Sequence, residues 1–391
     1  MNNFTFYSPT YFVFGKGTEN EAGKYVKKFN GTKVLIHYGG GSVIQSGLLD
    51  RVKKSLENEA IPFVELGGVK PNPRDDLVYK GIDLCKREQV DFILAVGGGS
   101  TIDSAKAIAA GSVYDGDFWD FYQGKPIEHA LGIGTVLTIA AAGSEGSGDS
   151  VITKLNGNYK RGASGDGIRP KFSILNPALT QTLPSYQSAS GIADIMAHLF
   201  ERYFTITTDV EVTDRLIESL LITMLMEGPK VIADPNNYEA RANIMWAGMM
   251  AHNNSVGVGR NQDWASHNIE HELSAQYDIT HGAGLAVVVP AVMNYTMEKD
   301  IMRFARLAVN VFGVPMDYDS PKLTAKEGVN RLRVYFSELG LPGNFTELGA
   351  KEEDIDEMAH RACYGDARQG TLGGFANLGE EDVKNIYRSM L

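Results

Sequence analysis

Residues that could bind a metal ion recur in the second half of the chain at a spacing of four. Asp194 and His198 form the first pair. His267 and His271 form the second, and His281 follows at a turn before another predicted helix. Residues four apart lie on one face of an α-helix, so their side chains can reach a common ion. A carboxylate with neutral imidazoles is a nitrogen and oxygen donor set that suits Fe²⁺ or Zn²⁺ and leaves room for a substrate oxygen.

Spacing alone leaves a structural interpretation of these residues open. A single histidine on an amphipathic helix is more often a satisfied core residue than a ligand, and an Asp/His pair can be a simple helix hydrogen bond. Three such elements in one helical half shift the balance toward a metal site, but only the family resemblance described below makes it the preferred interpretation. His252 at a predicted helix end fits either role. We expect the remaining histidines to be structural or solvated, namely His37, His129 and His360.

A glycine-rich turn carries a second kind of chemistry. Gly97, Gly98, Gly99 and Ser100 follow a predicted strand and begin a predicted helix. Glycines let a backbone approach a pyrophosphate closely, and a helix N-terminus offers N–H donors and the positive end of a dipole. We expect Ser100 to be both the N-cap and a phosphate donor. The alternative is a tight turn that needs positive φ, for which one glycine is sufficient.

A second turn of the same kind, Gly39-Gly40-Gly41-Ser42, follows an earlier predicted strand. In dinucleotide sites an acidic residue at such a strand end holds the ribose 2′-OH and repels a 2′-phosphate. This chain has glycines and a serine there, which offer N–H donors and a hydroxyl to a 2′-phosphate. The turn therefore favours NADP(H) over NAD(H), and a plain turn is the alternative.

These motifs require elements that position them. Short apolar runs alternate with helical patterns up to about residue 184, which predicts βαβ units and a parallel, Rossmann-like sheet. We expect a further strand at 4–7, placed to pair across a homodimer. The other predicted strands are 33–38, 61–66, 91–96, 134–139, 149–153 and 172–175, with helices at 46–59, 75–88 and 101–111.

After residues 183–184 the pattern becomes almost entirely helical. The expected organisation is an α/β dinucleotide-binding domain over 1–184 and an all-helical metal-binding and substrate domain over 185–391. The predicted helices are 186–204, 209–227, 237–253, 263–274, 282–294, 299–309, 323–339, 351–363 and 379–389.

The composition is that of an ordinary globular protein. Of 391 residues, 43% are hydrophobic and 22% charged, and the net charge is −11. That charge disfavours nucleic acid and anionic membranes as partners. The two cysteines make no disulfide framework, and the N-terminus has neither a secretory signal nor a long apolar run. We therefore expect a cytoplasmic protein.

The order and spacing of these motifs resemble the iron-containing (group III) alcohol dehydrogenase family over essentially the whole chain. The pattern is a strand followed by GGGS-x-x-D, then G-x-x-D-x-x-x-H, H-x-x-x-H and H-G. Within the family, the turn at 38–42 and the stretch 262–265 look like the branch of NADPH-dependent butanol dehydrogenases and broad-range aldehyde reductases. The GGGS turn alone is shared with glycerol dehydrogenases and dehydroquinate synthases.

The resemblance implies a dehydroquinate synthase-like architecture and reversible hydride transfer between NADP(H) and short-to-medium primary alcohols or aldehydes, with Fe²⁺ or Zn²⁺ bound. It implies that His271 lies beside the nicotinamide and relays a proton. The implied metal ligands are Asp194, His198, His267 and His281. The implied cofactor contacts are Gly40, Gly41, Ser42, Gly97, Gly98, Gly99, Ser100, Asp103, Thr138 and Lys160.

Two positions depart from the family pattern and bear on cofactor affinity. Ala142 stands where a threonine is common, and Asn176 stands where an aspartate is common. The alternative activity is that of an NAD(H)-dependent glycerol or 1,3-propanediol dehydrogenase on the same fold. A dehydroquinate synthase-like lyase and a non-catalytic nucleotide- or metal-binding protein are the other functions weighed.

Overall fold

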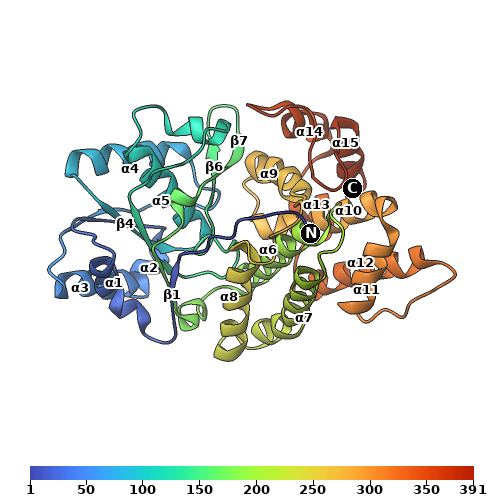
Figure 1. The fold of residues 1–391 in the computed structure, drawn as a ribbon, viewed down its shortest axis with the longest axis horizontal. Coiled ribbons are helices and arrows are strands. Elements are labelled where there is room, and N and C mark those ends of the chain that lie inside the picture. The colour runs from blue at the N-terminus through green and yellow to red at the C-terminus, as the bar shows by residue number, and fades with distance from the viewer. The chain divides into compact units, whose positions relative to one another are not determined.

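The computed structural model describes residues 1–391 and consists of two compact units (Figure 1). One unit is Tyr7–Thr182, and the other is Leu183–Leu391 together with Met1–Phe6. Residues 1–6 were predicted to belong to the α/β domain. They group with the helical unit because the Met1 ammonium donates to the carbonyl of Thr208 (3.0 Å) and the Asn2 N–H donates to that of Gly259 (2.8 Å).

The α/β unit is built on a six-stranded sheet in which all neighbouring strands are parallel. The strand order is β1-β8-β5-β4-β2-β3. A parallel sheet is covered on both faces, so its strands read as continuous apolar runs, as the strand Phe92–Gly97 does. The strands are β1 (Tyr11–Phe14), β2 (Val34–Tyr38), β3 (Phe63–Leu66), β4 (Phe92–Gly97), β5 (Gly132–Leu137) and β8 (Phe172–Leu175).

Helices cover the two faces of this sheet (Figure 1). On one face, α1 (Ala22–Lys28) and α3 (Leu48–Asn58) share a hydrophobic core with alternate residues of β2, β4 and β8. On the other face lie α4 (Asp75–Glu88) and α5 (Gly99–Ser112), which pack against each other. A short helix, α2 (Gly41–Gln45), follows β2 directly. The parallel sheet and the helical second half confirm the predicted fold class.

The strand prediction at 4–7 was wrong, and one confirmed strand lies outside the main sheet. The first strand is β1 at Tyr11–Phe14, at the edge of the sheet, and residues 4–7 form no strand. The two segments, FTFY and YFVF, are alike in composition, but only the second pairs, with β8. The strand predicted at 149–153 is β6 (Asp149–Lys154), which forms a separate antiparallel hairpin with the unpredicted β7 (Tyr159–Ser164).

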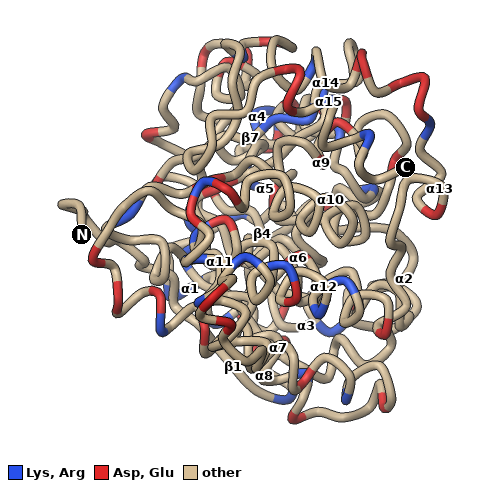
Figure 2. Tube along the Cα trace, turned by 90° about the vertical axis from the view of Figure 1, so that its right-hand side faces the viewer, with Lys and Arg blue, Asp and Glu red and all other residues tan.

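The second unit is helical, as expected, and α10 is its central helix. Helix α10 contains no Lys, Arg, Asp or Glu (Figure 2), and it packs against α6, α9, α12 and α15. None of the helices in the structure is long and apolar enough to cross a membrane. The helices are α6 (Ser185–Tyr203), α7 (Glu211–Ala233), α8 (Tyr238–His252), α9 (Ala265–Tyr277), α10 (His281–Thr296), α11 (Ile301–Asn310), α12 (Pro321–Glu338), α13 (Phe345–Leu348), α14 (Ile355–Tyr364) and α15 (Glu380–Arg388).

Candidate metal centre and glycine-rich edge

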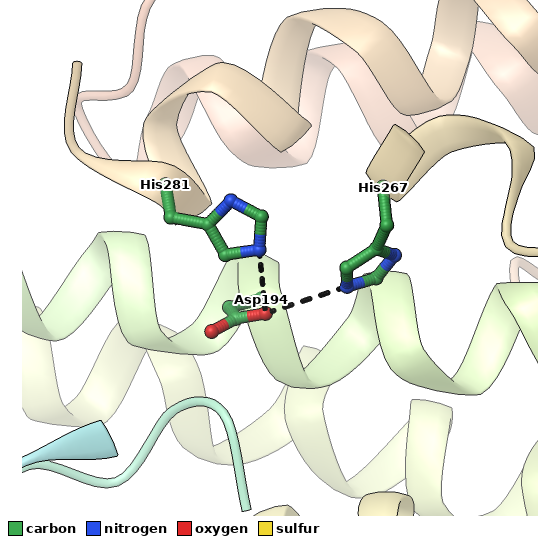
Figure 3. Close-up of side chains that lie close together, drawn as sticks. All are labelled: Asp194, His267 and His281. Atoms are coloured by element: carbon green, nitrogen blue, oxygen red, sulfur yellow. Dashed lines mark ion pairs between the residues drawn. The ribbon is translucent and has the colours of Figure 1, made fainter. Parts of the chain in front are cut away.

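Three of the four predicted metal ligands converge in the helical unit (Figure 3). Asp194 lies in the middle of α6, His267 in the first turn of α9, and His281 is the first residue of α10. The Nε2 atoms of His267 and His281 lie 3.8 Å and 3.9 Å from Oδ1 of Asp194. One ligand atom from each of the three residues lies within 4.8 Å of the others. The side chains therefore surround one point, although they come from separate helices.

The fourth predicted ligand, His198, lies beside this group but is not one of the three residues whose ligand atoms cluster. Its Nδ1 is 2.9 Å from the carbonyl oxygen of Asp194 and 3.2 Å from Oδ1 of the same residue. Its ring centroid is 4.5 Å from that of His267 and 4.2 Å from that of His252. His252, which the sequence left open, is thus buried against the candidate site.

Two carboxylates that sequence reasoning missed contact the other nitrogen of two of these imidazoles. Oε1 of Glu201 is 2.9 Å from Nδ1 of His267, and Oε2 of Glu270 contacts Nδ1 of His281. Both glutamates are buried. Helix periodicity could have indicated Glu201, because it lies seven residues after Asp194 and therefore on the same face of α6.

The residues of this group fit a divalent cation. Oδ1 of Asp194 and Nε2 of His267 are buried and have no hydrogen-bond partner. Buried polar atoms nearly always have a partner, so two such atoms that face each other at 3.8 Å point to a missing ligand. One carboxylate oxygen with imidazole nitrogens is also a donor set that Fe²⁺ and Zn²⁺ accept.

The electrostatics of the group agree with a site built for positive charge. Burial opposes protonation of His267, but the neighbouring carboxylates of Asp194 and Glu201 outweigh burial and raise its pKa to about 9. Burial and the neighbouring His252 hold the pKa of His198 well below its usual range. Burial alone would raise the pKa of Asp194, yet the surrounding imidazoles hold it well below its usual value.

His271, the predicted proton relay, is buried one turn after His267 on α9. Its ring centroid lies 5.5 Å from that of His281 and 6.4 Å from that of His267. His271 also forms a second close group of potential ligand atoms with Glu270 and His281. The imidazole is therefore next to the candidate metal centre without belonging to the group around Asp194.

Glycines allow α10 to approach its neighbours at this point. A Cβ on Gly282 would collide with the carbonyl oxygen of Ser190 on α6, well inside van der Waals contact. A Cβ on Gly284 would lie 2.6 Å from Oε1 of Glu270. The backbone of α10 thus rests directly on that of α6, which brings His281 next to Asp194.

The two predicted glycine turns lie side by side in the α/β unit. Strands β2 and β4 are adjacent and parallel, with Tyr38 paired to Val96, so their carboxyl ends meet at one edge. From β2 the chain adds β3 on one side of the sheet and β4 on the other, which makes this edge a topological switch point. Ligands of open α/β sheets bind at such a point.

The glycines of these turns are not required by backbone angles. None of Gly39–Gly41 or Gly97–Gly99 has positive φ, so the tight-turn alternative for Gly97–Gly99, which needs positive φ, was wrong. Gly97 is required by packing, since its Cβ would collide with Thr101, and a Cβ on Gly99 would lie 3.0 Å from that of Ala142. Around Gly40 a Cβ would meet nothing within 4 Å. This open space beside a helix N-terminus is the surface a phosphate would need.

The helix start after β4 differs from the prediction in one respect. The N-cap of α5 is Gly98, not Ser100, and no side chain caps its first turn. Ser100 lies inside that turn. The N–H groups at the start of α5 are therefore left without a side-chain acceptor from the chain, as they are at α2, whose N-cap is Gly40.

The other predicted cofactor contacts lie near this edge. Thr138 directly follows β5, and its N–H donates to the carbonyl of Gly97 (3.0 Å). Ser42 is the second residue of α2. Nζ of Lys160, on β7, donates to Asn72 (2.9 Å), in the segment that follows β3.

Asp103 has a structural role that the sequence did not indicate. Its Oδ1 accepts from Ser144 Oγ (2.5 Å), and its Oδ2 accepts from the N–H of Val151 (3.0 Å). One turn later on α5, the buried Lys106 donates to the carbonyls of Ser144 (2.7 Å) and Asp149 (2.7 Å). Burial raises the pKa of Asp103 to about 6 and lowers that of Lys106 to about 8, while each charge partly offsets the effect on the other. Asp103 thus anchors the segment after β5.

Asn176 also has a structural explanation. It is the N-cap of the 3₁₀ helix Pro177–Thr180, where Oδ1 accepts from the N–H of Ala178 (3.0 Å). Its Nδ2 donates to Oε2 of the buried Glu19 (2.8 Å). An aspartate could provide the cap but not the second bond.

Known proteins were compared with the whole chain. Residues 9–177 match the family "Iron-containing alcohol dehydrogenase", and residues 188–391 match "Fe-containing alcohol dehydrogenase family, C-terminal". NADH-dependent butanol dehydrogenase A of Clostridium acetobutylicum is 41% identical over 390 residues, which is 99% of each chain. NADPH-dependent aldehyde reductase YqhD of Escherichia coli is 37% identical over 92% of each.

A crystal structure extends this likeness to three dimensions. NADH-dependent butanol dehydrogenase A from Thermotoga maritima has a TM-score of 0.95 and 39% sequence identity, with 100% of this chain and 99% of that chain covered. The two halves of the sequence and the complete fold thus all match proteins of the same family. The chain belongs to the iron-containing alcohol dehydrogenase family, and its enzyme class is that of an alcohol dehydrogenase or aldehyde reductase.

Proposed function

We propose that the protein interconverts short-to-medium primary alcohols and aldehydes, of the butanol and butanal type, with NADP(H) and one Fe²⁺ or Zn²⁺. The observation that carries this proposal is the group of Asp194, His267 and His281, with two buried atoms that lack hydrogen-bond partners. The butanol and aldehyde specificities of the similar proteins support the substrate class.

Each residue of the group has a distinct task in this reaction. Asp194, His267 and His281 hold the cation, and His198 completes the set from the same helix as Asp194. Bound there, the cation supplies Lewis acidity toward the substrate oxygen, and the nicotinamide supplies or accepts the hydride. His271 moves a proton to or from the substrate oxygen at one of its ring nitrogens.

The preference for NADP(H) rests on the end of β2. No carboxylate follows Tyr38 there, and Gly40 leaves open space beside the N-terminus of α2. A 2′-phosphate is an anion that such a turn can accept, whereas a ribose 2′-OH lacks its usual acidic partner. The two butanol dehydrogenases named above are NADH-dependent, so the ratio of kcat/KM for NADPH and NADH is the measurement that decides between the cofactors.

The direct test of the proposed function is the His267→Ala variant. Metal content of the purified protein and NADPH-linked turnover of butanal should both fall. His129→Ala, which removes a histidine outside the group, is the matched control. If metal content and turnover are unchanged in His267→Ala, the ligand assignment is wrong. Metal analysis after anaerobic purification distinguishes iron from zinc.

We also propose that the protein is a homodimer that uses the edge strand β1. This strand ends the sheet, and its Tyr11 and Phe14 are exposed. An open apolar strand edge is a surface on which a second copy can pair. The molar mass from light scattering should be about twice 42.6 kDa, and Tyr11→Lys with Phe14→Lys should reduce it to that of one chain.

A further inference from the structure

All three imidazoles around Asp194 are held by their Nδ1 atoms. Glu201 holds His267, Glu270 holds His281, and the carbonyl oxygen of Asp194 holds His198. In the first two cases the acceptor is a buried carboxylate from a helix of the same unit. For His267 and His281, Nδ1 is thus turned away from the shared point and Nε2 faces Asp194, whereas Nδ1 of His198 lies 3.2 Å from Oδ1 of Asp194.

This pattern determines which nitrogen can bind an ion. A neutral imidazole has one N–H donor and one lone pair. When Nδ1–H donates to a carboxylate, the lone pair stays on Nε2 and the ring cannot rotate without losing the bond. A carboxylate in this position also makes Nε2 a stronger donor to a cation.

The two glutamates are themselves fixed in place. Oε1 of Glu201 accepts from the backbone N–H of His267 (2.9 Å) as well as from its ring. Oε1 of Glu270 accepts from the Ser274 hydroxyl, one turn later on α9. Gly284 leaves room for Glu270, because a Cβ there would come within 2.6 Å of Oε1.

We propose that Glu201 and Glu270 are positioning residues that select Nε2 of His267 and of His281 as the atoms that bind the ion and strengthen their binding. The inference rests on the proposed metal-binding function. It assigns the affinity of the site to the two glutamates as well as to the residues that face the ion. Gly284 contributes to this positioning, since the lack of a Cβ leaves the space that the Glu270 carboxylate occupies.

The test measures metal binding by the full-length protein, not turnover. Apo protein is prepared with a chelator, and Zn²⁺ or Co²⁺ is titrated in competition with a chromophoric chelator. We expect Glu201→Gln and Glu270→Gln each to raise the Kd about 10- to 100-fold. In the Co²⁺ form the d–d absorption bands should shift, because a ligand ring is no longer held in one orientation.

Glu272→Gln is the matched control. Glu272 is as buried as Glu270, lies two residues later on the same helix, and pairs with Arg361 (3.1 Å) instead of a histidine. This variant should lower the unfolding temperature of the apo protein while the Kd and the Co²⁺ spectrum remain those of the wild type. Gly284→Ala serves as a second probe of Glu270, because it displaces the carboxylate without removing its charge and should weaken binding too.

The outcomes separate this inference from the proposed function. If wild-type protein binds neither Zn²⁺ nor Co²⁺ at the expected 1:1 ratio, the metal-binding function itself is wrong. If the wild type binds and the Glu201 and Glu270 variants bind with the same Kd and spectrum, the positioning role is overturned and the function stands. If Glu272→Gln weakens binding as much as they do, the effect is one of general stability, and the positioning role is likewise overturned.

Discussion

The metal centre and the glycine-rich edge are specified in opposite ways. At the centre, side chains provide the ligand atoms, namely those of Asp194, His267 and His281, and other side chains hold them in place. At the edge, Gly40 and its neighbours provide space and backbone N–H groups. On the proposed function, a cation would be recognised by the ligand atoms that side chains offer, whereas an anion would be recognised where side chains are missing.

The largest effect is expected from removal of the one carboxylate at the centre. Asp194→Ala should lower kcat/KM for aldehyde reduction about a thousandfold, because a lost cation removes several kcal/mol of transition-state stabilisation. Metal content should fall in parallel. Asp356→Ala, which removes an exposed carboxylate on α14, is the control and should change neither quantity. An Asp194→Ala enzyme with full metal content would remove the distinction between the two regions.

A buried imidazole in the α/β unit shows what burial does to a histidine when no carboxylate lies beside it, in contrast to the histidines of the metal centre. His37 is fully buried, with Nδ1 donating to the carbonyl of Leu66 (2.9 Å) and Nε2 accepting from Ser104 (2.9 Å). With no carboxylate beside it, burial lowers its pKa to about 4, whereas that of His267 is raised. Because the unfolded chain binds the proton more readily, stability should fall as pH decreases from 6.5 to 4, by about 3 kcal/mol.

This pH dependence can be tested by denaturant unfolding at several pH values. His37→Asn should reduce stability at pH 7 and flatten the profile between pH 6.5 and 4. His360→Gln changes an exposed histidine on α14 and should leave the slope unaltered. An unchanged slope in His37→Asn would show that other groups cause the acid sensitivity.

Two alanine variants distinguish a glycine that packing requires from one that leaves space for the cofactor. Gly97→Ala should destabilise the fold by about 1–3 kcal/mol, because its Cβ would collide with Thr101. Gly40→Ala should leave stability unchanged, since the space there is open, and should weaken cofactor binding about tenfold. Thermal unfolding and NADPH titration measure the two effects. If Gly40→Ala binds NADPH as tightly as wild type, the cofactor does not approach this turn.

The smallest expected effect concerns cofactor choice. Gly40→Asp introduces the carboxylate that the end of β2 lacks, so it should repel a 2′-phosphate and accept a ribose 2′-OH. We expect the ratio of kcat/KM for NADPH over NADH to fall about tenfold. Gly124→Asp, at a glycine with open space in the same unit, controls for added charge alone, although its positive φ makes a stability measurement necessary.

Much of the fold could be predicted from the sequence because its helices and strands carry strong periodic signals. The helix 75–88 was placed at the bounds that α4 has in the structure. The strand β7 was missed because its sequence, YKRGAS, has no apolar alternation, and it is stabilised by pairing with β6. The prediction of a strand at 4–7 was wrong, because the sequence does not show which of two similar segments pairs with the edge of the sheet.

In the candidate site, too, some residues could be predicted from the sequence and others could not. Aspartate and histidine stand out at a spacing of four, so the group around Asp194 could be anticipated. Glu201 lies on the same face of α6 as Asp194, but it was missed because a glutamate followed by arginine near the end of a helix reads as a solvated surface pair. The reason for each glycine was also hidden, since collision with Thr101 and open space around Gly40 depend on tertiary packing.

The contact of Gly282 with Ser190 makes the size of the metal centre a property of the main chain. At Gly282 there is no side chain that could be shortened to change how far His281 stands from Asp194, and a longer one would collide with the backbone of Ser190. A larger or smaller ion would have to be accommodated by rotation of the rings or by exchange of a ligand. Divergence of metal preference on this scaffold should therefore proceed through the identity of the donors, while the span between the helices stays constant.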